Sequence, residues 1–122
     1  MSDSAQGMSH FPSAQTTFKP PLIANENAFL GDLATSDQNS PEKPITSGFF
    51  RLEAGTPLVY TYTYHEMKIV LEGQFDIEDQ TGKKVTATKG DCFYFPEGSK
   101  ITFTTPSYGL AFYTGQRKEG GA

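Results

Sequence analysis

Residues 60–73 read YTYTYHEMKIVLEG, and this stretch decides the fold. In its first half tyrosines alternate with threonines, the period-two pattern that places the three tyrosines on one face of a β-strand. Beyond a turn at Tyr64 and His65 a second strand begins, in which Glu66 and Lys68 share a face. The stretch therefore predicts two consecutive β-strands, each with side chains sorted onto two faces.

Short strands with turn residues between them continue on both sides of this stretch. Upstream, ITSGFFRLEAG ends in a turn; downstream follow QFDIED, KVTATKG, DCFYFPEG, KITFTT and GLAFYTGQR. Gly82 lies in the hairpin turn QTGKK, where it is free to adopt positive φ. A spacing of about 8 to 12 residues, with Gly or Pro at nearly every break, is typical of a β-sandwich or barrel. The sequence predicts an all-β domain over residues 45–117, with little helix.

The remaining segments lack this periodicity. Residues 1–20 are rich in Ser, Gln, Thr and Pro and predict a flexible tail, either disordered or swapped onto a neighbouring subunit. Residues 21–44 predict a polar linker, with one short helical turn near Phe29 and Leu33. Residues 118–122 predict a flexible C-terminus.

Composition narrows the class of protein. A chain of 122 residues is long enough for one domain with its own core. The net charge is −4 and no basic run exceeds two residues, which argues against nucleic acid or an anionic membrane as partner. No segment reads as a signal peptide or a membrane span. The single cysteine, Cys92, has no basic neighbour and predicts an inert buried thiol. We expect a cytoplasmic protein.

Two half-motifs carry a resemblance to a known family. Glu66 is followed after six residues by Gly73, and Gly90, Pro96 and Gly98 match the pattern G-x5-P-x-G. In this order and spacing they resemble the two strand-pair motifs of the cupin superfamily. The resemblance implies a single RmlC-like jelly-roll β-barrel, with the tyrosine face of residues 60–64 turned into its interior.

The resemblance also exposes a departure from the usual cupin metal site. The histidine positions of the first motif fall on Tyr60 and Tyr62, and that of the second falls on Ile101. Glu66 alone remains, and one carboxylate with tyrosines is a poor ligand set for a transition metal. We therefore expect no metal of the usual kind and leave the cofactor unknown, with a weak site at Glu66 and His65 as the alternative.

Within the cupins the chain is most similar to the ethanolamine-utilisation Q (EutQ-like) branch of short single-domain proteins. The similarity lies in YTYHEMKIVLEGQFDI and GDCFYFPEGSKITFTTPSYGLAFY. Membership implies a place in ethanolamine catabolism, and bacterial members have been assigned an acetate kinase activity. That activity needs donors for several phosphate oxygens, and Lys68, Lys100 and Arg51 are the cations expected near the barrel.

The residues expected in the barrel pocket fall into two groups. Glu66, Tyr60 and Tyr62 are the candidate catalytic residues, Glu66 as acid or base and the tyrosines as hydrogen-bond donors. The candidate substrate-binding residues are Lys68, Phe95, Phe103 and Tyr113. A Glu and a Lys two apart on an inward face predict either a mutual ion pair or a wet pocket, because burial of an unpaired charge is costly. Core packing remains the plainer explanation for the tyrosines.

Several functions fit these residues. The first is an enzyme of lyase, isomerase or dehydratase type that acts on a small polar metabolite without the usual metal. The alternatives are a non-catalytic ligand-binding or scaffold cupin, or an acetate-kinase-like activity by family analogy. The apolar runs FFRL and MKIVL exceed what one interior can hold, and they predict a homodimer.

Overall fold

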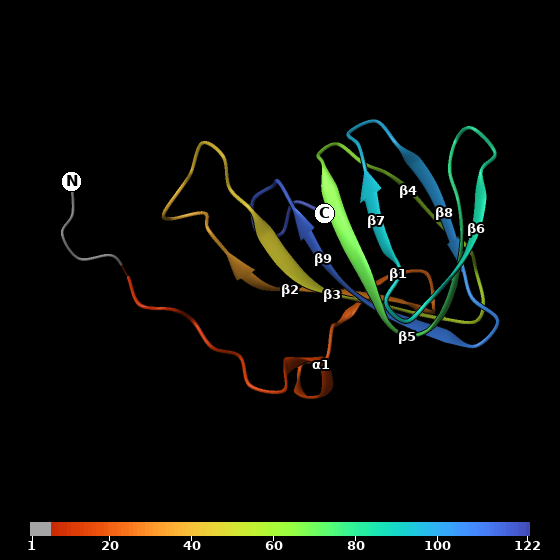
Figure 1. Ribbon diagram of the computed structural model, residues 1–122, viewed down its shortest axis with the longest axis horizontal. Coiled ribbons are helices and arrows are strands. Elements are labelled where there is room, and N and C mark those ends of the chain that lie inside the picture. Colours follow the sequence, from red (N-terminus) through yellow and green to blue (C-terminus); the bar gives the residue numbers. More distant parts are fainter. Residues whose placement is uncertain (1–5) are drawn as a thin grey trace.

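The computed structural model describes residues 6–122, in which β-strands are the dominant element (Figure 1). One short helix, α1 (Ala14–Thr17), and two strands, β1 (Leu22–Ala24) and β2 (Ala28–Thr35), come first. The later strands are β3 (Thr46–Glu53), β4 (Leu58–Thr61), β5 (Glu66–Glu78), β6 (Lys84–Thr88), β7 (Cys92–Phe95), β8 (Lys100–Thr104) and β9 (Tyr108–Gly115). The predicted all-β barrel with little helix is confirmed.

The long strand β5 connects the two sides of the barrel. Its first part, Glu66–Ile69, pairs with β7 and β9, whereas Gln74–Glu78 pairs with β6 and β8. Between them the register shifts and Gly73 adopts a φ of 70°, a conformation that favours glycine. A Cβ at Gly73 would also collide with the backbone of Tyr108. The glycine predicted from the motif is therefore the point at which β5 bends from one side to the other.

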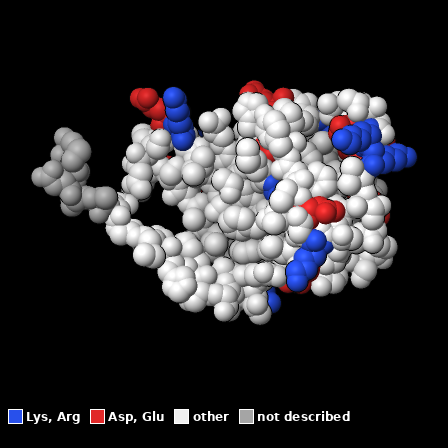
Figure 2. All heavy atoms as spheres, in the orientation of Figure 1, with Lys and Arg blue, Asp and Glu red and all other residues white. Residues whose placement is uncertain are grey.

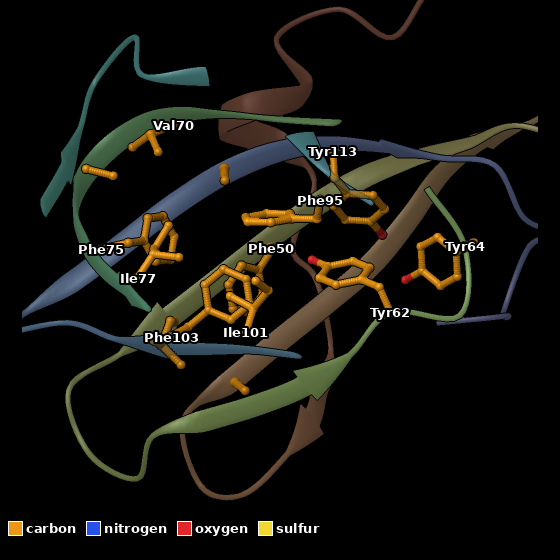
Figure 3. Packing of buried hydrophobic residues seen from close by; sticks show 14 residues of the cluster. Phe50, Tyr62, Tyr64, Val70, Phe75, Ile77, Phe95, Ile101, Phe103 and Tyr113 are labelled. Atoms are coloured by element: carbon orange, nitrogen blue, oxygen red, sulfur yellow. The ribbon is translucent and has the colours of Figure 1, made fainter. Parts of the chain in front are cut away.

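The hydrogen-bonded order of the strands is β1-β2-β3-β9-β5-β8-β4, with β6 and β7 also paired to β5. This arrangement is a nearly closed barrel whose interior is filled with aromatic and aliphatic side chains (Figure 3). Phe50 stacks on Phe75 at 5.5 Å between ring centroids and meets Phe103 edge-on at 5.3 Å. Such pairs add to the burial of apolar area that holds the two sides together.

The predicted polar linker over residues 21–44 is wrong, because β1 and β2 lie there. Phe29 and Leu33 belong to β2, which pairs along β3, and not to a helical turn. Asp32 gives the segment its coil-like character, yet its carboxylate accepts hydrogen bonds from the Tyr113 hydroxyl at 2.6 Å and from Arg117 at 2.8 Å. Partners distant in sequence thus stabilise a strand that local propensity disfavours.

Phe18 near the N-terminal end and Gly120 near the C-terminal end contact the pair of strands β2 and β3. Phe18, just after α1, packs its ring 5.9 Å from that of Phe49, while the segment before α1 extends away from the barrel (Figure 1). Residues 118–122, predicted to be flexible, are held in part by the Gly120 N–H, which donates to Asp32 at 2.8 Å. The first five residues of the predicted tail lie outside the described residues.

Charged side chains are dispersed on the face seen in Figure 2, where Lys and Arg lie among Asp and Glu. This face carries no continuous basic surface. Among residues 6–122, no helix has the length and apolar character needed to cross a membrane.

The Asp32–Arg117 ion pair makes the free energy of unfolding depend on pH in the acid range. Burial raises the pKa of Asp32, but hydrogen bonds from Arg117, Gly120 and Tyr113 outweigh burial and lower this pKa below its ordinary value. The charged carboxylate therefore adds stability above the unfolded-state pKa of about 3.9, and this stability is lost as pH falls through the lower folded-state pKa.

We expect Asp32→Asn to lower the free energy of unfolding at neutral pH by about 2 kcal/mol, because it removes hydrogen bonds to a charged acceptor. Below about pH 4, the free energy of unfolding of the variant should also fall less steeply than that of the wild type. Urea unfolding at several pH values measures both, with the exposed Glu42→Gln as control. An unchanged acid profile would contradict this role of Asp32.

Candidate functional site

A cavity of about 230 Å³ lies within the barrel and is lined by residues of strands β1, β2, β3, β4, β5 and β8, of the segment between β4 and β5, and by Ala122. Apolar and aromatic side chains form most of its wall. Its polar groups come from five residues, Tyr60, Tyr62, Tyr64, Glu66 and Lys68. The structure therefore brings both halves of the stretch 60–73, the tyrosines of residues 60–64 and the pair Glu66 and Lys68, to one cavity.

The two half-motifs meet at Tyr62. Its N–H donates to the carbonyl of Ser99 at 2.8 Å, and the N–H of Gly98 donates to the carbonyl of Tyr62 at 2.7 Å. Gly98 has a φ of 94°, so the turn that holds Tyr62 uses a conformation suited to glycine. The turn of the second motif thus fixes the backbone from which the Tyr62 side chain enters the barrel.

Glu66 and Lys68 lie on the inward face of β5, as the alternation predicts. Glu66 pairs in register with Phe95 of β7 and Gly115 of β9, so its backbone is held on both sides. The Lys68 Nζ lies 3.3 Å from Glu66 Oε2, and both side chains are only 4% exposed. Of the two predicted arrangements, the ion pair is the one observed.

Tyr62 completes a buried triangle with this pair. Its hydroxyl donates to Glu66 Oε2 at 2.5 Å, and Lys68 Nζ donates to the Tyr62 oxygen at 3.4 Å. In Figure 3 the hydroxyl end of Tyr62 points toward Phe50 and Phe95. Burial, together with the negative charge of Glu66, raises the pKa of Tyr62 well above its ordinary value. Tyr62 therefore remains protonated and acts as a donor at neutral pH.

Aromatic rings surround the ammonium group of Lys68. Its Nζ lies 4.6 Å from the ring centroid of Phe50, 4.7 Å from that of Phe103 and 5.7 Å from that of Phe95. Cation–π attraction favours the charged form. Burial nevertheless lowers the pKa of Lys68, and the attraction of Glu66 offsets only part of that effect. The lysine is therefore easier to deprotonate than an exposed one.

A second pair of hydroxyls lies beside the triangle. Tyr60 and Tyr64 are 3.0 Å apart at their hydroxyl oxygens, and only one of them can donate to the other. The accepting hydroxyl keeps a proton that it can donate to a ligand. Among residues 6–122, no group donates a hydrogen bond to Glu66 Oε1. The cavity thus offers one hydrogen-bond donor and one carboxylate acceptor to a bound molecule.

His65 faces away from this cavity. Its Nδ1 accepts a hydrogen bond from the Glu97 N–H at 3.1 Å and lies 3.0 Å from the Tyr94 hydroxyl, on the outer face of β5 and β7. These contacts give no support to the alternative of a weak metal site at Glu66 and His65, because consecutive residues of an extended chain point to opposite faces. Within residues 6–122, no three His, Cys, Asp or Glu side chains are grouped to hold a metal ion.

Three other predicted positions differ from the expected pocket. Phe95 stacks on Tyr62 at 5.2 Å between ring centroids and supports it from behind. Tyr113 does not line the cavity, because its hydroxyl donates to Asp32 on another side of the barrel. Cys92 is exposed and not buried, and it lines a separate groove of about 450 Å³ near β6 and β7 that does not contain the ion pair.

The predicted site lacked seven residues that line the cavity: Ile23, Ala24, Leu30, Phe50, Leu58, Tyr64 and Ala122. Two of them, Tyr64 and Phe50, lie next to the polar groups. Tyr64 shares the period-two register of Tyr60 and Tyr62, so the alternation alone could have included it. Phe50 comes from β3, and its place beneath Lys68 depends on the pairing of β3 with β9. Nothing local in FFRL distinguishes Phe50 from its neighbour Phe49.

This strand order, with a cavity inside the barrel, defines a cupin-type jelly roll. Ectoine synthase from P. lautus shares the fold, with a TM-score of 0.70 over 89% of this chain and 78% of that chain, at 15% identity. The model of the family "Ethanolamine utilisation protein EutQ" matches residues 24–116. The chain therefore belongs to the EutQ family, and the match includes the β1–β2 region outside the predicted barrel.

Relatives agree with this assignment. A curated relative from Clostridioides difficile, "Acetate kinase EutQ", is 38% identical over 58 residues, which cover 48% of this chain and 36% of the relative. The solved structure of the Clostridium difficile EutQ protein has a TM-score of 0.62 and 31% identity, covering 73% of this chain and 61% of that chain. This chain spans about a third of the length of the curated relatives that it matches.

Removal of one member of the buried pair should be strongly destabilising. We expect Lys68→Met to lower the free energy of unfolding by about 3–5 kcal/mol, because it leaves the Glu66 carboxylate buried without its partner. Glu66→Gln added to Lys68→Met should recover part of this loss. Urea unfolding of the wild type, both single variants and the double variant gives the coupling energy.

The exposed pair of Arg51 and Glu53 supplies a matched control. Its atoms are 3.1 Å apart, but the side chains are 37% and 46% exposed. The same cycle on this pair should give a coupling of at most about 1 kcal/mol. Additive effects at Glu66 and Lys68 would show that the buried contact contributes no specific stability.

Proposed function

We propose that this chain is a cytoplasmic enzyme of the EutQ family that acts on a small polar metabolite by proton transfer, in a lyase, isomerase or dehydratase reaction, without a bound metal. The observation that carries the proposal is Glu66. Its Oε2 is held by Tyr62 and Lys68, while its Oε1 has no protein donor among residues 6–122. A carboxylate that is fixed by one oxygen and has no protein donor at the other is suited to move a proton.

The other polar groups supply complementary roles. The unpaired proton of the Tyr60–Tyr64 pair can be donated to an oxygen on which negative charge develops. Lys68 keeps a positive charge next to Glu66 and so limits the cost of the buried carboxylate. Proton transfer by a positioned carboxyl group contributes about 10²- to 10⁴-fold to a rate.

The alternatives are less well supported. A pure scaffold has no need of a cavity with unused donor and acceptor groups, whereas a ligand-binding protein would share every contact described here. Acetate-kinase-like activity, the name carried by the curated relatives, requires several donors for phosphate oxygens and a metal ion. The Lys68 ammonium in this cavity is already paired with Glu66. Proton-transfer chemistry is therefore the better fit.

We expect Glu66→Gln to lower kcat by about 10²- to 10⁴-fold with little change in ligand affinity. The variant should stay folded, because glutamine still accepts the Tyr62 hydrogen bond and Lys68 can lose its proton. A thermal-shift screen of small hydroxy acids, amino alcohols and carbonyl compounds would identify ligands. Proton NMR in deuterated water would then detect turnover or exchange.

Glu72→Gln is the matched control, since Glu72 lies on the same strand but bonds Gln15 and Tyr108. An undiminished rate in Glu66→Gln would refute the catalytic role, and ligand binding without turnover in the wild type would favour a binding protein. Near-stoichiometric Fe, Mn, Ni or Zn in protein purified without chelator would refute the metal-free mechanism. Transfer of a phosphoryl group from ATP to acetate that depends on Lys68 would favour the acetate-kinase-like alternative.

We also propose that the chain forms a homodimer through the outer face of β5, β7 and β9. Met67 and Tyr94, which pair in register across β5 and β7, are 65% and 54% exposed, and Ile45 beside them is 53% exposed. Contiguous apolar side chains on a sheet are usually covered by a partner. We take a second copy of this chain as the partner, because it is always present at the same concentration as the chain itself.

Light scattering at tens of micromolar should give the mass of a dimer. Met67→Asp should shift the mass toward that of the monomer, because it places a charge in the apolar contact. Val59→Asp is the control, since Val59 is 51% exposed on β4, away from this face. A monomeric wild type, or equal dissociation by both variants, would contradict the proposed interface.

A further inference from the structure

The amine of Lys68 is a buried nucleophile that the proposed acid–base reaction leaves chemically unused. It lies at the wall of the 230 Å³ cavity, with Glu66 Oε2 at 3.3 Å and the Tyr62 oxygen at 3.4 Å. Phe50, Phe95 and Phe103 exclude water from its remaining surroundings. Lysines held in apolar pockets are the ones that serve as covalent nucleophiles toward carbonyl groups.

We propose that Lys68 forms an imine with a small aldehyde or ketone bound in this cavity, with Glu66 as the group that takes up and returns the proton. The inference deepens the proposed function and rests on it, because it uses the same carboxylate. It adds a substrate class, short carbonyl compounds, and a covalent residue.

The first requirement is a neutral amine. At 3.3 Å the Lys68 ammonium can pass a proton to Glu66, which gives an uncharged amine and an uncharged carboxylic acid. Burial disfavours two charges relative to two neutral groups. Burial lowers the pKa of Lys68, and this effect acts in the same direction. Tyr62, which stays protonated, can hydrogen-bond to the carboxyl group in either state.

The bond changes then balance without a further reagent. The amine lone pair of Lys68 attacks the carbonyl carbon, the C=O π electrons move to oxygen, and a C–N bond forms. That oxygen gains one proton and the nitrogen loses one, which gives a carbinolamine. Glu66 then donates its proton to the hydroxyl, which leaves as water while the nitrogen lone pair forms the C=N bond. The iminium N–H returns a proton to the Glu66 carboxylate, which gives the neutral imine. One aldehyde and one lysine amine thus give one imine and one water.

The cavity sets the size and polarity of the carbonyl compound. Its volume suits a small molecule, and its wall is largely apolar apart from the five polar residues described above. The free hydroxyl proton of the Tyr60–Tyr64 pair can be donated to the carbonyl oxygen. Short aliphatic aldehydes and ketones combine a small apolar chain with one acceptor oxygen, and they match both features.

Reductive trapping tests this inference on the full chain. Propanal with sodium cyanoborohydride at neutral pH should convert an imine into a stable propyl amine, seen as one added propyl group in the intact mass. An exposed lysine is protonated at this pH and reacts slowly. Peptide mapping should therefore find Lys68 labelled at least about ten-fold more than the exposed Lys100.

Three variants sharpen the result. Lys68→Arg keeps the positive charge but cannot form an imine, so it should lose the label, whereas Lys100→Arg should keep it. Glu66→Gln should slow labelling of Lys68 by about ten-fold or more, because glutamine cannot donate a proton to the hydroxyl that leaves as water. Since the wild-type peptide map is decisive by itself, failure of a variant to fold does not block the test.

The outcomes separate this inference from the proposed function. Absence of label at Lys68, or equal labelling of Lys68 and Lys100, would overturn the imine even where Glu66→Gln abolishes turnover, and the acid–base function would then stand alone. Equal labelling of Lys68 in the wild type and Glu66→Gln would overturn the proton path through Glu66. Label at Lys68 that depends on Glu66 supports the inference.

Discussion

The structure of the cavity depends on one interaction, the buried contact between Lys68 and Glu66. Two charges placed inside an apolar barrel would each cost several kcal/mol if they stood alone. At 3.3 Å they compensate one another, and the Tyr62 hydroxyl and three phenylalanine rings supply the remaining contacts. Strands β3, β5 and β8 therefore contribute both to the cavity wall and to the surroundings of this pair.

The backbone places the pair with little freedom. β5 is held between β7 and β9 where Glu66 and Lys68 lie, and it bends only beyond them, at Gly73. Tyr62 is held independently, through the turn at Gly98. Gly73 and Gly98, two of the three glycines that mark the half-motifs in the sequence, thus have mechanical roles on either side of the site. Rigid strands, rather than loops, fix the distances on which the chemistry depends.

The sequence revealed those parts of the molecule that follow from local periodicity. Alternation predicted the strands and the shared face of Glu66 and Lys68, and it left an ion pair and a wet pocket as the two alternatives for these residues. It failed where a residue depends on distant partners: Asp32 made β2 look like coil, because Arg117, which neutralises it, lies 85 residues away. It also failed for Tyr113, whose hydroxyl donates a hydrogen bond to Asp32 instead of facing the cavity. Cys92 was misjudged because β7 is paired only with β5, so its outer surface is exposed.

The tyrosines at the usual histidine positions of the cupin motif acquire a physical explanation from Lys68. A bound metal ion gathers lone pairs around a positive charge, whereas here the positive charge is an ammonium group attached to β5. Phenol and carboxylate oxygens near Nζ, with aromatic rings about its remaining sides, are suitable neighbours for such a cation. Unlike a metal ion, an ammonium group can give up a proton to the carboxylate beside it. The same contact that compensates the buried charge is therefore able to change its protonation state, which is the property that acid–base and amine chemistry both require.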